Sequence, residues 1–257
     1  MKLSCCAWAL PGTHNEVVDC VVDLGFQFID LQPFAYAGKG IHRLSRAELE
    51  VCCIAASVGI HKDLSLESDD LAVIAAALQH LDIVCAYGAH LGATTAYVVP
   101  GMETVFDRKR YADTLVAAAD IGSKHGIRLA VEHFPGRALS TAAATVQFLD
   151  EIDHPNLYLL FDLGHAQMSH EDPVAALEAA GPRLGYIHLD DNDGVADSHL
   201  ALLDGVMTEN SLRCTLETLS TIGYTGPVSL ELNPTLPDSA DALRRSRIIV
   251  QNLTDID

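Results

Sequence analysis

Short apolar runs alternate along the chain with amphipathic segments, and this alternation predicts a repeated strand–helix unit. Apolar residues recur at helical spacing in two of the amphipathic segments, at Leu71, Ile74, Ala75, Leu78 and Leu81 and at Leu212, Leu216, Leu219 and Ile222. Strands are predicted at Lys2–Ala9, Phe26–Leu31, Ile60–Leu66, Thr95–Val99, Ile127–His133, Leu157–Asp162, Leu184–Leu189 and Val228–Leu232.

Turn and capping residues agree with this division. Ser45 and Glu48 match an S-x-x-E capping box. Asp172 precedes Pro173 in the order expected of an N-cap followed by a proline in the first turn of a helix. The glycines that stand before or close to a predicted strand, where a helix commonly ends in a left-handed residue, are Gly25, Gly59, Gly126 and Gly223.

Eight such units, one per roughly thirty residues, predict a parallel sheet that closes on itself as a (β/α)8 TIM barrel. An open doubly wound sheet is the structural alternative, but it normally carries a glycine-rich phosphate loop, and this sequence has none. No linker or change of composition divides the chain, so we expect a single domain over residues 1–257.

The chain is 49% hydrophobic and 20% charged, with a formal net charge of −19. That charge argues against nucleic acid and anionic membranes as partners, because both are bound through Lys and Arg. No apolar stretch is expected to approach the length that spans a bilayer, and the apolar N-terminal run is interpreted as a strand rather than a signal peptide. Seven cysteines without metal-finger or disulfide spacing indicate buried, reduced thiols and a cytoplasmic protein.

The last four predicted strands each deliver an ionisable residue to one rim of the barrel. These residues are Glu132, Asp162, His188 and Glu231, and the carboxyl ends of barrel strands form the face that carries reactive groups. Three carboxylates brought together would repel one another unless a cation lay between them. The donor set predicts one divalent ion, Mn²⁺, Mg²⁺ or Co²⁺, with Zn²⁺ as an alternative.

These residues and their surroundings resemble the xylose isomerase-like barrel superfamily. The resembling segments are VEHF, LLFDLGHA, GYIHLDDNDGVADSHL and GPVSLELNP, all in the C-terminal half, whereas the N-terminal half agrees only in its strand–helix rhythm. The superfamily includes sugar isomerases, tagatose and psicose epimerases, hydroxypyruvate isomerase, inosose and dehydroshikimate dehydratases, and endonuclease IV repair enzymes. The resemblance implies that the four rim residues are metal ligands.

The resemblance also suggests roles for further residues. His165 is similar to a histidine that contacts the substrate or a further metal ion, and Asp197 with His199 resembles a D-x-H element of the loop after the seventh strand. For His199 a surface loop position is the alternative. Trp8 ends the predicted first strand and is a candidate wall for a sugar ring, with core packing as its alternative. Many relatives continue with a proline and Gly-x-Gly, whereas here only Gly205 is present.

Four functions remain open at this point. The first is a sugar isomerase or epimerase that transfers a proton through an enediolate between Glu132 and Glu231. The second is a dehydratase in which His165 or His199 supplies the acid. A phosphodiester hydrolase is disfavoured by the net charge and by the positions of His61 and His90, neither of which is expected at the active rim. A barrel that binds without catalysis is disfavoured because all four ligand positions are filled.

Whether the substrate carries phosphate stays open, although few basic residues are candidates for the active rim, which favours a substrate without phosphate. A sugar or a keto-polyol fits this expectation. Relatives often assemble as dimers or tetramers, so a homo-oligomer is consistent with the resemblance. The basic candidates are Lys39, Arg43, Lys62 and Arg137.

Overall fold

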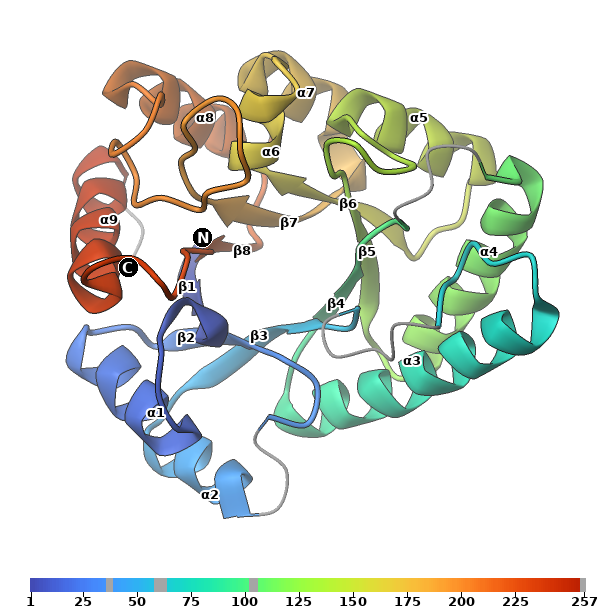
Figure 1. The fold of residues 1–257 in the computed structure, drawn as a ribbon, viewed down its shortest axis with the longest axis horizontal. Helices are drawn as coiled ribbons and strands as arrows, with labels where there is room; N and C mark the ends of the chain where they lie inside the picture. The colour runs from blue at the N-terminus through green and yellow to red at the C-terminus, as the bar shows by residue number, and fades with distance from the viewer. Residues whose placement is uncertain (36–38, 58–63, 102–105, 255–257) are drawn as a thin grey trace.

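The computed structural model describes residues 1–35, 39–57, 64–101 and 106–254. Eight parallel strands close into one barrel in sequence order, as the alternation of the sequence predicts (Figure 1). The last strand pairs with the first, so every strand has two neighbours. The strands are β1 Lys2–Cys6, β2 Phe28–Leu31, β3 Glu50–Ala55, β4 Thr95–Val98, β5 Arg128–Glu132, β6 Leu157–Asp162, β7 Leu184–Leu189 and β8 Pro227–Leu230.

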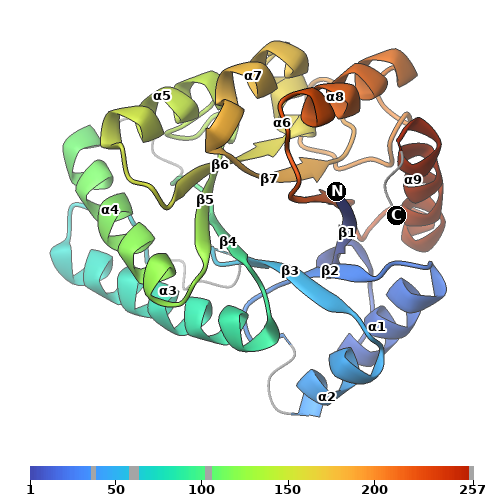
Figure 2. The ribbon, with the colours of Figure 1, turned by 180° about the vertical axis from the view of Figure 1, so that it is seen from behind.

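Helices surround the strands in both views (Figures 1 and 2). The long loop between β7 and α8 lies in front of the strands in Figure 1. The helices are α1 His14–Asp23, α2 Lys39–Arg46, α3 Leu71–Leu91, α4 Arg108–Lys124, α5 Ala142–Ile152, α6 Leu163–Met168, α7 Pro173–Ala180, α8 Glu209–Thr221 and α9 Ser239–Leu253, and the short 3-10 turns are η1 Ala7–Ala9 and η2 Gly181–Arg183.

The strands separate two apolar clusters because successive side chains point to opposite faces. On β6, Leu159 and Phe161 belong to the larger cluster between strands and helices, whereas Leu160 belongs to a smaller cluster inside the barrel. Tyr97 of β4 and Tyr186 of β7 join Leu160 in that interior cluster. A core on each face of the sheet leaves the carboxyl ends of the strands as the place where polar groups can gather.

Most predicted elements are confirmed, and β6 and β7 begin and end where the sequence predicts. Asp172 caps α7 through the backbone N–H of Val174, with Pro173 in the first turn. Gly25, Gly126 and Gly223 all have positive φ, as helix-ending residues should. Gly59 lies outside the described residues.

The third strand is a correction. It is Glu50–Ala55 rather than Ile60–Leu66, of which residues 64–66 are not in a strand and residues 60–63 lie outside the described residues. The sequence EVCCIA is a continuous apolar run after one glutamate, which is the pattern of a strand buried on both faces. The Ser45–Glu48 capping box is also wrong, because Ser45 lies inside α2 and Glu48 has a φ of 57° after the helix ends.

Helix α3 corrects the expectation that no apolar stretch reaches the length of a membrane span. Its 21 residues are long and apolar enough for one by length and composition alone. In the structure the helix contacts α4, β3 and β4, and it buries Leu81, Val84 and Cys85. The apolar residues of α3 are therefore explained by its packing against the barrel.

Candidate metal centre

Four predicted residues meet at the carboxyl ends of neighbouring strands. Glu132 ends β5, Asp162 ends β6, His188 lies in β7, and Glu231 follows β8 directly. One ligand atom from each lies within 4.8 Å of the corresponding atoms of the other three. Nδ1 of His188 is 2.6 Å from Oε2 of Glu231, 3.7 Å from Oε1 of Glu132 and 3.9 Å from Oδ2 of Asp162. We refer to these four residues as the tetrad.

The strand register explains why the tetrad converges. Asp162 is the direct partner of His188 in the β6–β7 pair, and His188 is the partner of Ser229 in the β7–β8 pair. Aligned residues of parallel strands point to the same face, so the side chains of Asp162 and His188 both enter the barrel mouth. Glu231 comes two residues after Ser229 and so returns to that face, where its backbone N–H donates to the carbonyl of Leu189.

Local hydrogen bonds orient the carboxylates of Asp162 and Glu231. One oxygen of Asp162 caps α6 by accepting the backbone N–H of His165 at 2.7 Å, which leaves Oδ2 turned toward the tetrad. Trp8 lies in η1, after β1 has ended at Cys6, and its indole N–H donates to Oε1 of Glu231 at 2.7 Å. Trp8 therefore orients a tetrad residue, a role that the sequence did not predict.

The tetrad fits a divalent cation. Glu132, Asp162 and His188 are buried, and Oδ2 of Asp162 has no hydrogen-bond partner among the described residues. A buried polar atom without a partner is costly, and a cation at this position would satisfy it. Three carboxylates and one imidazole match the oxygen and nitrogen donors that hard and borderline divalent ions prefer.

The electrostatics of the tetrad also favour a positive charge at its centre. Burial raises the pKa of Glu132, and burial together with the neighbouring Asp190 raises the pKa of Asp162 to about 7. Burial would raise the pKa of Glu231 as well, but the His188 imidazolium beside it lowers that pKa to about 2. Without a cation, protons on these groups must offset the crowded negative charge.

A second group stands beside the tetrad and consists of His165, Asp197 and His199. Oδ1 of Asp197 is 3.4 Å from Nε2 of His165 and 3.2 Å from Nε2 of His199. Burial opposes protonation of both histidines, but the nearby carboxylates outweigh it and raise the pKa of His165 to about 10 and that of His199 to about 12. Both imidazoles are therefore positively charged at neutral pH when no metal is bound.

The loop between β7 and α8 places this second group. Oδ1 of Asn192 accepts the backbone N–H groups of Ser198 and His199, and Nδ1 of His199 lies 2.9 Å from Oδ2 of Asp190. A side chain at Gly205 would collide with the Asn192 backbone and the Asp191 carboxylate. A glycine is thus required at position 205, because the backbone there passes close to Asp191 and Asn192.

Asn192→Ala is expected to loosen the loop, because two backbone N–H groups lose their acceptor. The free energy of unfolding should fall by about 1–3 kcal/mol, and KM for the substrate should rise because His199 is no longer held. Urea unfolding and steady-state kinetics measure the two effects. Asp193→Ala is the matched control, since Asp193 only caps the local turn at Val195 and Ala196. Equal KM values for the two variants would contradict this role of Asn192.

The raised pKa of Asp162 predicts how the metal-free protein responds to pH. The folded state holds this proton more tightly than the unfolded state, whose reference value is 3.8, so its stabilising contribution is complete below that value. The contribution should be lost as the pH rises through about 7. Urea unfolding of the metal-free protein across this range measures the loss, and Asp162→Asn should flatten it. An unchanged pH dependence in Asp162→Asn would refute the assignment.

Several residues that shape the site escaped the sequence analysis. His133 accepts the Asp162 backbone N–H through Nε2, and its carbonyl oxygen accepts Nδ1–H of His165. Asp190 contacts His199 and also accepts the backbone N–H of Gly164. His133 is adjacent to Glu132 in the sequence, and Asp190 is two residues after His188. Polar residues close in sequence to a predicted ligand could therefore have been recognised as candidates.

The predicted basic residues have mixed outcomes. Arg137 stacks on Phe134, whose ring lies 4.2 Å from that of His165, and it donates to the carbonyl of Pro100. Arg43 forms an ion pair with Asp19 of α1, away from the tetrad. Lys62 and His61 lie outside the described residues, and the side chain of Lys39 is not described. His90 lies in α3.

Comparison with known proteins gives the family. The family model described as xylose isomerase-like TIM barrel matches residues 18–249 of the chain. Among solved structures, the D-allulose 3-epimerase of Methylomonas sp. in complex with D-allulose superposes with a TM-score of 0.83 over 99% of this chain and 97% of that one, at 17% identity. This similarity confirms the fold.

Curated relatives match over shorter segments. A D-psicose 3-epimerase of Agrobacterium fabrum is 28% identical over 194 residues, which are 66% of this chain and 65% of that protein. An inosose dehydratase of Serratia proteamaculans is 33% identical over 106 residues, 38% of this chain and 35% of that protein. The chain thus spans less than two thirds of the length of each of these two relatives.

Proposed function

The chain belongs to the xylose isomerase-like TIM barrel family, and on that premise we propose that it is a divalent-metal-dependent epimerase or isomerase of an unphosphorylated sugar or keto-polyol. The observation that carries the proposal is the tetrad, in which Glu132 at the end of β5 and Glu231 directly after β8 flank Asp162 and His188. Relatives named as sugar 3-epimerases support this class of reaction.

The tetrad would hold the ion, and its oxygen-rich donor set favours Mn²⁺, Mg²⁺ or Co²⁺ over Zn²⁺. When bound, such an ion acts as a Lewis acid that stabilises negative charge developing on the substrate oxygens. Asp162 and His188 mainly fix its position. We assign all four residues as ligands.

Glu132 and Glu231 are the proposed proton carriers. One carboxylate removes the proton from the carbon beside the substrate carbonyl, and the other returns a proton from the opposite side, which inverts that carbon. Return of the proton to the adjacent carbon would move the carbonyl instead. In the metal-free protein the pKa of Glu132 is raised by burial, whereas that of Glu231 is lowered by His188, so the surroundings of the two carboxylates differ.

The second group would bind and orient the substrate. Charged His165 and His199 can donate hydrogen bonds to hydroxyl or carbonyl oxygens, and Asp197 between them can accept one from a hydroxyl. Trp8 stays a candidate for contact with the sugar ring beside Glu231. Arg137 is the only predicted basic residue found near this rim among the described residues, which supports a substrate without phosphate.

Proton NMR in heavy water tests the reaction class. Incubation of candidate ketoses with the Mn²⁺-loaded enzyme, followed by removal of the paramagnetic ion, should give an epimer or isomer that carries deuterium at the inverted or adjacent carbon. Heat-inactivated enzyme is the control. Formation of an alkene or enol product would show a lyase, and the absence of any exchange across a panel of ketoses and keto-polyols would refute the proposal.

A dehydratase is the second candidate, and the second group is the observation that favours it. Protonated His165 or His199 could donate a proton to a departing hydroxyl after the same initial proton removal. The inosose dehydratases among the relatives are consistent with this reaction.

An endonuclease IV-like hydrolase is the third candidate. His165, Asp197 and His199 form a further group that could hold an ion. The net charge of −19 opposes binding of a phosphate backbone, and β2, β3 and β4 contribute no histidine to the candidate metal groups of the described residues. A nicking assay on duplex DNA that contains abasic sites tests this candidate.

The remaining expectations stay proposals. We propose one domain over residues 1–257 and a reducing, cytoplasmic location, which fits seven free cysteines, five of them buried. A homo-oligomer is consistent with the family resemblance, and sedimentation velocity would determine the assembly.

A further inference from the structure

An acidic residue lies inside the barrel, close to His188 of the tetrad, in an otherwise apolar strand. Asp30 of β2 is completely buried. Its Oδ1 accepts hydrogen bonds from the hydroxyls of Ser4 at 2.9 Å and Tyr186 at 2.6 Å. These bonds fix the carboxylate and leave Oδ2 directed elsewhere.

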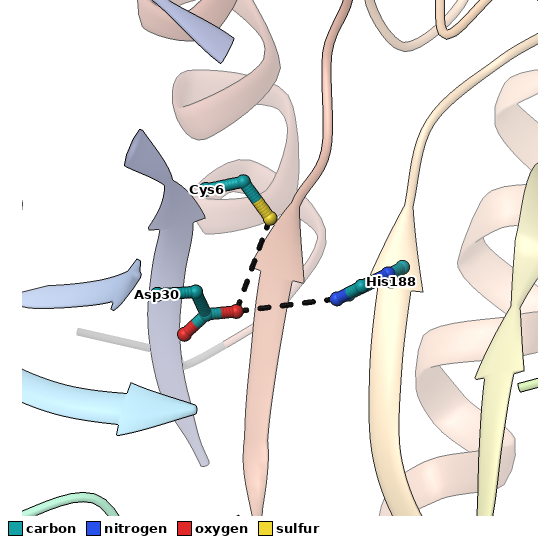
Figure 3. A group of neighbouring side chains, drawn as sticks. All are labelled: Cys6, Asp30 and His188. Carbon is teal, nitrogen blue, oxygen red and sulfur yellow. Dashed lines mark hydrogen bonds and ion pairs between the residues drawn. The ribbon is translucent and has the colours of Figure 1, made fainter. Parts of the chain in front are cut away.

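The second oxygen of Asp30 faces a tetrad residue. Oδ2 accepts a hydrogen bond from the Cys6 thiol, whose Sγ is 3.9 Å away, and lies 4.0 Å from Nε2 of His188. Figure 3 shows the side chains of Cys6 and His188 both pointing toward this one oxygen. Nε2 of His188 is buried and has no hydrogen-bond partner among the described residues. At 4.0 Å the two atoms do not form a hydrogen bond, but Asp30 is the carboxylate that faces this nitrogen and the candidate acceptor for its N–H.

The two ring nitrogens of His188 face opposite ways. Nδ1 points to the carboxylates of Glu132, Asp162 and Glu231, and Nε2 points to Asp30. A neutral imidazole binds a cation through the nitrogen without a proton, so its proton must reside on the other nitrogen. A carboxylate at that other nitrogen fixes the tautomer and the ring orientation, and it increases the basicity of the ligating nitrogen.

We propose that Asp30 is a positioning residue that holds the Nε2–H of His188 and thereby directs the Nδ1 lone pair into the tetrad. The inference rests on the proposed metal-dependent function. It assigns a role in metal affinity to a residue of β2 that lies inside the barrel and faces the tetrad through His188.

The same three side chains, Cys6, Asp30 and His188, lie close enough to form a second metal group of their own. A hydrogen bond from His188 to Asp30 fits these side chains better than a second metal ion does. If Nε2 as well as Nδ1 bound an ion, the imidazole would have to lose both of its protons. One oxygen of Asp30 is also already committed to two hydroxyl donors.

Asp30→Asn tests the proposal in the full-length chain. Titration calorimetry with MnCl₂ on metal-free protein should show an affinity about 10–100-fold weaker than that of the wild type, because the partner of Nε2 loses its charge. Ser4→Ala is the matched control, since it removes a donor to the other oxygen of the same carboxylate, and its affinity should stay within about threefold of wild type. A loss of stability alone would not change the affinity of the folded protein.

A measurement on the wild type keeps the test independent of how the variant folds. With ¹⁵N-labelled histidine and the Zn²⁺-loaded protein, the ring signals of His188 should show a proton on Nε2 that exchanges slowly with water. In Asp30→Asn this proton signal should move upfield. A proton on Nδ1 in the loaded wild type would overturn the proposal.

The outcomes separate this inference from the proposed function. Failure of the wild type to bind any divalent ion would overturn both. A wild type that binds one ion and an Asp30→Asn variant of equal affinity would overturn only the role of Asp30. A second ion per chain, lost in both Asp30→Asn and Cys6→Ser, would overturn it in favour of a buried metal site.

Discussion

Glu132→Gln and Glu231→Gln are each expected to lower kcat by at least about 10³-fold while the fold persists. Each amide keeps the shape of the side chain but cannot carry the proton, and acid–base catalysis of this kind contributes about 10²–10⁴-fold. Each variant also replaces a charged side chain among the proposed metal ligands with a neutral one, which should add to the loss. Steady-state kinetics at saturating Mn²⁺, with circular dichroism for the fold, measure the effect.

The two variants should differ in stability without metal. The pKa of Glu132 is raised, so the charge of this side chain is unfavourable in the folded protein. Glu132→Gln removes that charge and should therefore increase the free energy of unfolding. The pKa of Glu231 is lowered by His188, so the loss of its charge should decrease that free energy. Glu151→Gln, at an exposed pair with Arg108, is the control and should retain activity. Full activity in either tetrad variant would refute its role as a proton carrier.

Removal of divalent ions is expected to abolish activity and to lower the thermal stability. An ion that binds only the folded state at a concentration 100 times its Kd stabilises that state by about 2.7 kcal/mol. For a chain of this size the corresponding fall in Tm is about 5–10 °C. Dialysis against EDTA followed by scanning calorimetry measures the fall, and added Mn²⁺ should restore both Tm and turnover.

Asp162→Asn supplies the control for this experiment. The variant lacks the buried carboxylate oxygen that has no other partner, so its Tm should respond much less to EDTA and to Mn²⁺. An equal response in the variant and the wild type would place the ion elsewhere. An active, EDTA-treated wild type of unchanged Tm would contradict metal dependence.

The fold and the tetrad were predictable because both depend on short-range patterns. Buried parallel strands leave continuous apolar runs, and the residue that ends each run reaches the same rim regardless of the intervening sequence. The strand Leu157–Asp162 shows both features, since its apolar run ends directly in a proposed ligand. The third strand was misplaced because two apolar segments lie within twenty residues of each other, and periodicity alone does not choose between them.

The supporting residues were not predictable in the same way. Asp30 contacts Tyr186, which is 156 positions away, and Trp8 contacts Glu231 across 223 positions. Such pairs depend on the closure of the barrel, which pairs β1 with β8 and lets side chains of β2 and β7 meet in its interior. An aspartate in the apolar sequence FIDL was a signal of an interior polar group, but its partner could not be named without the structure.

The most direct measurement of the central idea is anomalous X-ray diffraction from crystals grown with Mn²⁺. We predict one strong anomalous peak between the carboxylates of Glu132, Asp162 and Glu231 and Nδ1 of His188, with ligand distances typical of Mn–O and Mn–N bonds. No peak at that position, or four side chains that turn away from one another, would contradict the metal centre and the proton-transfer chemistry built on it.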